Sequence, residues 1–296
     1  MRVARLREER FGSQRFDADG FRRIAHPMSG GFSLATMFLV MGASLLAVVV
    51  VMAVSFAIGT ATGKYSIIDA IWGPGFVVIA AVSFAIGHGH GDPTLRMVAL
   101  IAVAIWGLRL GGYILLRNHG LPEDARYVDM LRGHGPLVIV RKVQLPQGLA
   151  MWFVSLPVQI AMLVPHPVPA VMWLGVAVYL VGIVFESVGD AQLARFKSDP
   201  AHRGQLMNRG LWRYTRHPNY FGDATVWWGL YLLVVWSLPG ALTVLSPLVM
   251  TYLLVAKTGK ALTEKRMSSS KPGYADYVAR TSGFFPLPPR KGSLTS

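Results

Sequence analysis

The chain has 296 residues, of which 53% are hydrophobic and only 15% are charged, a composition more apolar than that of an ordinary soluble domain. Its formal net charge of +14 would suit a nucleic-acid binder, but in so apolar a chain it is more typical of cytoplasmic loops that face anionic lipid. The absence of cysteine excludes disulfides, iron–sulfur clusters, thiolate nucleophiles and cysteine-ligated metals.

Apolar segments recur along the chain at lengths close to that of a spanning helix, which needs roughly 20 residues. In chain order there are seven of them, at residues 32–58, 67–86, 95–116, 148–164, 168–190, 220–236 and 241–256. The fourth contains Pro157, and the sixth contains Asp223 near its start. The pattern predicts an all-α, polytopic membrane protein with about seven transmembrane helices.

Two regions differ in character. Residues 1–31 form a polar, basic N-terminal extension, and residues 32–296 form a single membrane domain without an evident internal repeat. Because polar residues precede an apolar run that is too long for a cleaved signal, we expect the first helix to remain in the protein.

The distribution of Lys and Arg predicts the orientation. The segments that follow the third, fifth and seventh helices are strongly basic, whereas the opposite connectors near 88–92, 165–167 and 237–240 contain no Lys or Arg. We therefore expect the basic face and the C-terminus to be cytoplasmic. The arginines of residues 1–31 would then lie outside, so either the basic loops override them in setting the orientation or one span is miscounted.

Two acid-containing pairs mark a candidate site. Glu186 and Asp190 are four residues apart at the end of the fifth helix, and Asn219 and Asp223 are four apart at the start of the sixth, so each pair shares one helix face. Such groups enter a membrane helix when something polar meets them. The sequence therefore predicts one shared polar pocket, although a pair wetted by interfacial water stays open as the alternative for Glu186 and Asp190.

A basic stretch precedes the sixth helix. Arg213, Tyr214, Arg216 and His217 lead to Pro218, which suits the first position of a helix. A helix N-terminus flanked by arginines can bind a phosphate group, which indicates an anionic cofactor or lipid headgroup as the ligand. The alternative is that these arginines only contact lipid phosphates.

Several segments together resemble the steroid 5-alpha-reductase superfamily, and more narrowly its large, little-characterised bacterial branch. They are IDAIWGPGF (68–76), WGLRLGGYILLRN (106–118), EDARY (123–127), FESVGDAQL (185–193), GLWRYTRHPNYFGD (210–223) and GYADYVARTSGFFPLPP (273–289). The resemblance implies a seven-helix enzyme of the bacterial inner (plasma) membrane. It would transfer hydride from NADPH, which enters from the cytoplasm, to a carbon–carbon double bond of a lipid.

The resemblance also implies roles for individual residues. The family's cofactor-binding positions on the fifth and sixth helices correspond to Glu186, Asp190, Asn219 and Asp223, although the family has an Asn where Glu186 stands. Further cofactor-binding positions correspond to Lys197, Lys260 and Glu264, and we add the basic stretch Arg213, Tyr214, Arg216 and His217. The family's substrate-polarising Glu and Tyr correspond to Asp69 and Tyr113, with Asp69 orienting Tyr113. We assign Trp72, Arg109 and Trp227 to the substrate pocket and expect Arg109 to pair with Asp69 or a carbonyl.

Other function classes stay open. Integral membrane methyltransferases of the isoprenylcysteine carboxyl methyltransferase type share the RHPxY element but bind S-adenosylmethionine and carry a glutamate pair where this chain has Thr263 and Glu264. A non-enzymatic lipid binder or transporter is a further alternative, although the charges cluster at one face. We expect no nucleic-acid partner, and no metal at His88 and His90, which lack a further ligand. The chain has neither a GxGxxG nor a GxxxxGK motif.

Overall fold

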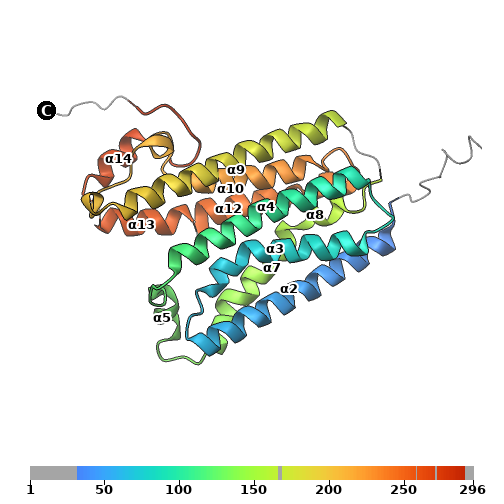
Figure 1. The fold of residues 1–296 in the computed structure, drawn as a ribbon, viewed down its shortest axis with the longest axis horizontal. Helices are drawn as coiled ribbons and strands as arrows, with labels where there is room; N and C mark the ends of the chain where they lie inside the picture. Colours follow the sequence, from blue (N-terminus) through green and yellow to red (C-terminus); the bar gives the residue numbers. More distant parts are fainter. Residues whose placement is uncertain (1–31, 166–168, 258, 271, 291–296) are drawn as a thin grey trace, which may run out of the picture.

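The computed structural model describes residues 32–165, 169–257, 259–270 and 272–290, so the N-terminal extension lies outside the described residues. Within them every regular element is a helix, and the nearest approach to a strand is an isolated bridge between Thr215 and Ser282. The helices run side by side along one direction (Figure 1). The structure therefore confirms the all-α class.

Five helical runs in the described part of the chain are long and apolar enough to cross a membrane. They are α2 (Leu34–Thr62), α3 (Ile67–Ile86), α4 (Pro93–Asn118), α9 (Pro169–Ser198) and the run Leu238–Lys257, which joins α11 (Leu238–Ala241), η4 (Leu242–Val244), α12 (Leu245–Tyr252) and η5 (Leu253–Lys257). These runs support an integral membrane protein.

The predicted fourth helix is longer than expected and is broken. It comprises α6 (Leu137–Ile139), η1 (Val140–Gln144), α7 (Leu145–Val154) and α8 (Leu156–Ala161). Because Pro157 has no N–H to donate to Phe153, the hydrogen-bond ladder is interrupted at Ser155. The hydroxyl of Ser246 donates to the Phe153 carbonyl instead, at 2.9 Å, which attaches α12 to α7 at the break.

The predicted sixth helix is α10 (Pro218–Leu232), which has only 15 residues. Neither α10 nor the broken fourth helix qualifies as a membrane span by length and hydropathy, so the predicted count of seven is not confirmed. Pro218 starts α10, as expected from its fixed φ, with His217 at the cap position.

Glycines allow α9 and α10 to pack backbone against backbone. A methyl group added to Gly222 would collide with the backbone nitrogen of Glu186, and one added to Gly182 would lie 2.5 Å from the nitrogen of Val226. This close contact brings the face of α9 that carries Glu186 against the face of α10 that carries Asp223. Large residues at either glycine would separate the two acids.

The centre of the bundle is aromatic. Trp227 of α10, Trp106 of α4 and Phe76 of α3 are fully buried, and their ring centroids lie 4.7 to 5.4 Å apart. The indole of Trp227 therefore packs in the core against α3 and α4, which is at odds with the predicted role in substrate binding.

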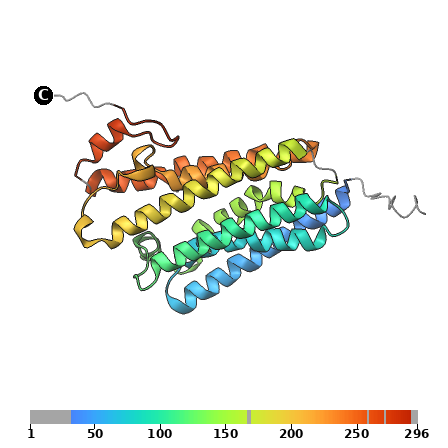
Figure 2. The ribbon, with the colours of Figure 1, turned by 45° about the horizontal axis from the view of Figure 1, so that its top comes forward.

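One end of the bundle carries a cap of short helices (Figure 2). The cap consists of η2 (Pro200–His202), η3 (Gly210–Arg213), α13 (Lys260–Ser270), α14 (Tyr274–Arg280) and the segment 281–290, and α5 (Ala125–Leu131) lies at the same end. The hydroxyl of Thr215 donates to the Phe284 carbonyl at 2.8 Å, which ties the C-terminal segment to the start of α10.

Candidate functional site

Arg109 of α4 connects the predicted acids. Its guanidinium forms an ion pair with Glu186 and a second one with Asp190 at 3.0 Å, while the Asn219 side chain donates to Asp190 at 3.2 Å. The expected pairing of Arg109 with Asp69 or a carbonyl is therefore wrong. Sequence reasoning missed the contact because α4 and α9 are distant in the chain, and their rotation about each other is fixed by packing.

Two carboxylate oxygens at this site accept no hydrogen bond of good geometry from the described residues, although the indole of Trp106 interacts with the carboxyl of Asp223. They are Oε2 of Glu186 and Oδ1 of Asp223, and both side chains are buried. A buried carboxylate oxygen without a donor costs free energy, because it has lost water without replacing it. The pair is therefore suited to accept hydrogen bonds from an amide or hydroxyl of a ligand.

These acids line a cavity of about 370 Å³ between the helices, which we call the bundle cavity. Its lining also includes Asn219 and the apolar side chains of Leu110, Ile114, Met250 and Leu253. Both predicted polar pairs thus meet at one cavity. Asp69, Trp72 and Tyr113 lie on its wall as well.

A second cavity of about 600 Å³, which we call the cap cavity, lies between the bundle end and the cap. Its wall carries cationic and aromatic side chains, namely Arg117, Arg126, Lys197, Arg203, Arg216, Trp212, Tyr220, Tyr274 and Tyr277. Arg117, Arg126, Asn219 and Tyr220 line both cavities. The two spaces therefore adjoin, with a basic, aromatic wall at the cap and a wall of acids and apolar side chains inside the bundle.

Asp69 has partners that the sequence did not indicate. Arg126 of α5 contacts its Oδ2 at 3.0 Å, and the hydroxyl of Tyr127 donates to its Oδ1 at 3.1 Å. Its two oxygens are thus engaged by α5, whereas Tyr113 packs its ring against Arg117 at 5.7 Å. The expectation that Asp69 orients Tyr113 is not supported by these contacts. Arg117 and Arg126 are site residues that were missed; both lie within the segments that carry the family resemblance.

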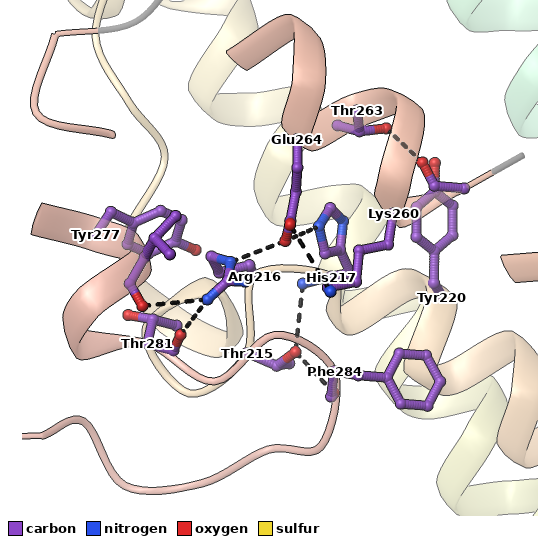
Figure 3. Close-up of polar contacts among 12 residues, drawn as sticks. Thr215, Arg216, His217, Tyr220, Lys260, Thr263, Glu264, Tyr277, Thr281 and Phe284 are labelled. Carbon is purple, nitrogen blue, oxygen red and sulfur yellow. Dashed lines mark hydrogen bonds and ion pairs between the residues drawn. The ribbon is translucent and has the colours of Figure 1, made fainter. Parts of the chain in front are cut away.

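Glu264 of α13 lies at the centre of a cluster at the cap cavity (Figure 3). Its Oε1 accepts from Nε of Arg216 at 2.9 Å and lies 3.1 Å from Nε2 of His217, and its Oε2 lies 3.7 Å from Nζ of Lys260. Arg216 also donates to the carbonyl of Thr281. The cluster joins four predicted cofactor residues to the C-terminal segment.

The cluster shifts the titration of its members. Burial lowers the pKa of His217 to about 4, despite the hydrogen bond with Glu264 that raises it. Partial burial would raise the pKa of Glu264, but the hydrogen bond and charge of Arg216, with His217 and Lys260, bring it below its ordinary value. At neutral pH the site therefore holds a neutral imidazole and an ionised Glu264, which Arg216 and Lys260 flank.

These shifts predict a loss of stability in mild acid. Because the pKa of His217 is about 4 in the folded protein and near 6.5 when unfolded, the unfolded chain binds the proton more readily between these values. Stability should fall as the pH drops from 6.5 to 4, by about 3 kcal/mol from this group. Denaturant unfolding of wild type and His217→Gln measures it. The exposed His134→Gln variant is the control and should behave as wild type; a His217→Gln variant with the same pH dependence as wild type would refute the prediction.

The remaining predicted residues divide into two groups. Lys197 lines the cap cavity, and Lys260 belongs to the Glu264 cluster. Arg213 and Tyr214 line neither cavity, because the short helix η3 turns Arg213 toward a different hollow and leaves Tyr214 43% exposed. Their predicted contact with the cofactor has no support from their positions.

Among the described residues no cluster of three or more His, Asp or Glu suits a metal ion, and His90 contacts Thr36 at 3.0 Å.

Comparison with known proteins gives a family but no activity. No solved structure matches the chain. An uncharacterised protein of Schizosaccharomyces pombe is 26% identical over 229 residues, which are 64% of this chain and 63% of that protein, so the chain spans less than two thirds of its relative. A family model described as a protein of unknown function, DUF1295, matches residues 55–281 and so includes both cavities. The chain belongs to the DUF1295 family.

Proposed function

We propose that the protein is a membrane-embedded reductase that uses NADPH to reduce a carbon–carbon double bond of a lipid. The observation that carries the proposal is the pair of adjoining cavities, one basic and aromatic at the cap and one within the bundle whose wall combines buried acids with apolar side chains. A dinucleotide needs cations for its phosphates, whereas a lipid needs apolar walls. The resemblance to the steroid 5-alpha-reductase superfamily supports the same assignment.

The side chains present fit a nicotinamide dinucleotide. Arg117, Lys197 and Arg216 at the cap cavity supply positive charge for phosphates. In the bundle cavity, Oε2 of Glu186 and Oδ1 of Asp223 would accept hydrogen bonds from a carboxamide N–H₂. When bound, NADPH would supply the hydride for the reduction.

The substrate would occupy the bundle cavity. Its lining of Leu110, Ile114, Met250 and Leu253 suits a steroid- or enone-like, polyprenyl or unsaturated acyl group. In reduction of an enone, one alkene carbon gains a hydride and the other a proton, and negative charge develops on the carbonyl oxygen. The phenol of Tyr113 would donate a hydrogen bond to that oxygen.

Tyr113→Phe should therefore preserve NADPH binding and slow turnover by about 100-fold or more, because a positioned acid or hydrogen-bond donor contributes roughly 10² to 10⁴ in rate. Single-turnover oxidation of NADPH with a panel of lipid enones measures the rate, and NADPH fluorescence measures binding. Tyr252→Phe, on a half-exposed ring outside both cavities, serves as the control. A Tyr113→Phe rate equal to wild type would remove the proposed role.

Seven membrane crossings with a cytoplasmic cap would follow if the broken fourth helix and α10 also span. Because the chain lacks cysteine, single cysteines can be introduced and labelled from one side of intact cells. We expect a cysteine at Gly89 to react from the outside, and one at Gly135 or Phe285 to react only after lysis. Labelling of all three from the same side would contradict the topology.

The function is tested most directly by identifying the small molecule that the purified protein retains. Mass spectrometry of the material released on denaturation should find NADPH or NADP⁺. Retained S-adenosylmethionine would instead indicate the membrane methyltransferase alternative. If neither a nicotinamide dinucleotide nor S-adenosylmethionine is retained, and neither binds on titration, the protein is better described as a lipid binder or transporter.

A further inference from the structure

A third hollow lies on the cap, next to the cap cavity, with which it shares Leu206 and Tyr277. We call it the arginine hollow, since four arginines line it, and its volume is about 770 Å³. The arginines come from three separate parts of the chain: Arg209 and Arg213 from the η3 region, Arg280 from the end of α14, and Arg290 from the C-terminal segment.

Within the part of the chain that the structure describes, no ion pair neutralises the arginines of the hollow. None of the four guanidinium groups lies within 4.0 Å of a carboxylate among the described residues, and Asp276 is the one acid on the wall formed by those residues. By contrast, Arg109, Arg126 and Arg216 are each paired with an acid. Four like charges gathered on one concave surface repel one another, so the arrangement favours an anion between them.

The backbone around the hollow is held in place by specific hydrogen bonds. The N–H of Arg290 donates to the carbonyl of Arg280 at 2.9 Å, and the N–H of Leu287 donates to the carbonyl of Tyr214 at 3.0 Å. The hydroxyl of Tyr277 donates to the carbonyl of Trp212. The segments that carry the four arginines are thus linked directly to one another, and the hollow is a built feature of the cap.

Apolar side chains are exposed on the C-terminal segment that carries Arg290. Phe285 is 65% exposed and Leu287 is 55% exposed, although both belong to the segment that ends in Arg290. The ring of Phe285 lies 6.2 Å from that of Phe221 in the first turn of α10, so this segment lies at the end of the bundle. Exposed Phe and Leu side chains at a membrane surface insert at the boundary between headgroups and acyl chains.

We propose that the arginine hollow binds the phosphate headgroup of an anionic phospholipid. Guanidinium groups form bidentate hydrogen bonds with phosphate oxygens, and basic pockets at the membrane surface select anionic headgroups. Phe285 and Leu287 contact the glycerol and upper acyl region while Arg209, Arg213, Arg280 and Arg290 surround the phosphate. The bound lipid joins the C-terminal segment to η3, and this role is independent of the reductase activity proposed above.

Lipid retention by the full chain tests the proposal. The protein is exchanged into micelles with equal amounts of phosphatidylglycerol and phosphatidylcholine, and retained lipids are counted by native mass spectrometry. Wild type should retain phosphatidylglycerol over phosphatidylcholine by about fivefold or more. The variant R209Q/R213Q/R280Q/R290Q should lose this preference. The control R132Q/R141Q/K142Q/R195Q removes the same charge from exposed side chains outside all three cavities and should keep it.

Three results would overturn the proposal. In the first, wild type retains phosphatidylglycerol and phosphatidylcholine equally. In the second, both quadruple variants lose the preference for phosphatidylglycerol to the same extent, so the preference is a general effect of charge. In the third case, inorganic phosphate alone would raise the thermal stability of wild type as much as phosphatidylglycerol does, and the ligand would be free phosphate. If the first quadruple variant does not fold, the exposed single substitutions R280Q and R290Q should each reduce the preference, and an unchanged preference in both would count against the hollow.

Discussion

Replacing Asp223 by Ala should weaken NADPH binding by about 10- to 100-fold, the effect of losing a hydrogen bond to a charged group. Asp223 is buried beside Glu186, and its Oδ1 accepts no hydrogen bond of good geometry from the described residues, although the indole of Trp106 interacts with the carboxyl. In the proposed complex it accepts a hydrogen bond from the cofactor carboxamide, so its removal costs binding. Titration of the purified variant with NADPH, followed by fluorescence, measures the change.

The fold should survive this substitution, because the variant removes a buried charge that lacks a complete set of partners. Asp129→Ala removes a carboxylate from an exposed side chain of α5 and should bind NADPH as wild type does. Asn219→Ala should resemble Asp223→Ala, since Asn219 lines both cavities and holds Asp190. If both Asp223→Ala and Asn219→Ala bind NADPH with wild-type affinity, the cofactor does not bind at this part of the structure.

Arg109→Leu should destabilise the protein by about 3–5 kcal/mol, the usual cost of removing one partner from a buried ion pair. The substitution leaves the buried carboxylates of Glu186 and Asp190 without their shared cation. Denaturant unfolding in detergent, monitored by tryptophan fluorescence, measures the loss.

The double variant Arg109→Leu/Glu186→Leu separates this electrostatic effect from a packing defect. It removes one of the two orphaned acids and should regain part of the lost stability, because a buried pair replaced by apolar side chains of similar volume is often tolerated. Arg141→Leu, on an exposed side chain, should change little. A double variant no more stable than Arg109→Leu would show that Arg109 acts through packing.

The polar pairs of α9 and α10 illustrate how far local spacing reaches. Two residues four apart share a helix face in any α-helix, so the pairs Glu186/Asp190 and Asn219/Asp223 could be placed without coordinates. Their meeting at one cavity required the rotation of both helices, which the close contact at Gly182 and Gly222 sets. One shared pocket was predicted because polar groups in neighbouring membrane helices need something polar to meet them, and the family resemblance implied the same grouping, but the helical pattern alone does not fix the rotation.

The fourth and sixth helices show where a one-dimensional pattern fails. Hydropathy treats 148–164 and 220–236 as spans, but the structure breaks the first at Ser155 and ends α10 at Leu232. The break depends on Pro157, and the freed carbonyl of Phe153 is accommodated by Ser246, which is far away in the sequence. A pattern of apolar residues carries no information about that partner.

The sequence by itself determined the all-helical class, the membrane environment of the long helices, the start of α10 at Pro218 and the position of the basic segments at one end of the bundle. Each of these follows from local composition or from the fixed period of a helix. Only the tertiary structure decided that Arg109 neutralises Glu186 and Asp190, that Asp69 is held by α5, and that Arg213 belongs to the arginine hollow. The physical reason is that a charge acts over a few ångströms in space, and which distant segments come within that range is set by packing of the whole bundle.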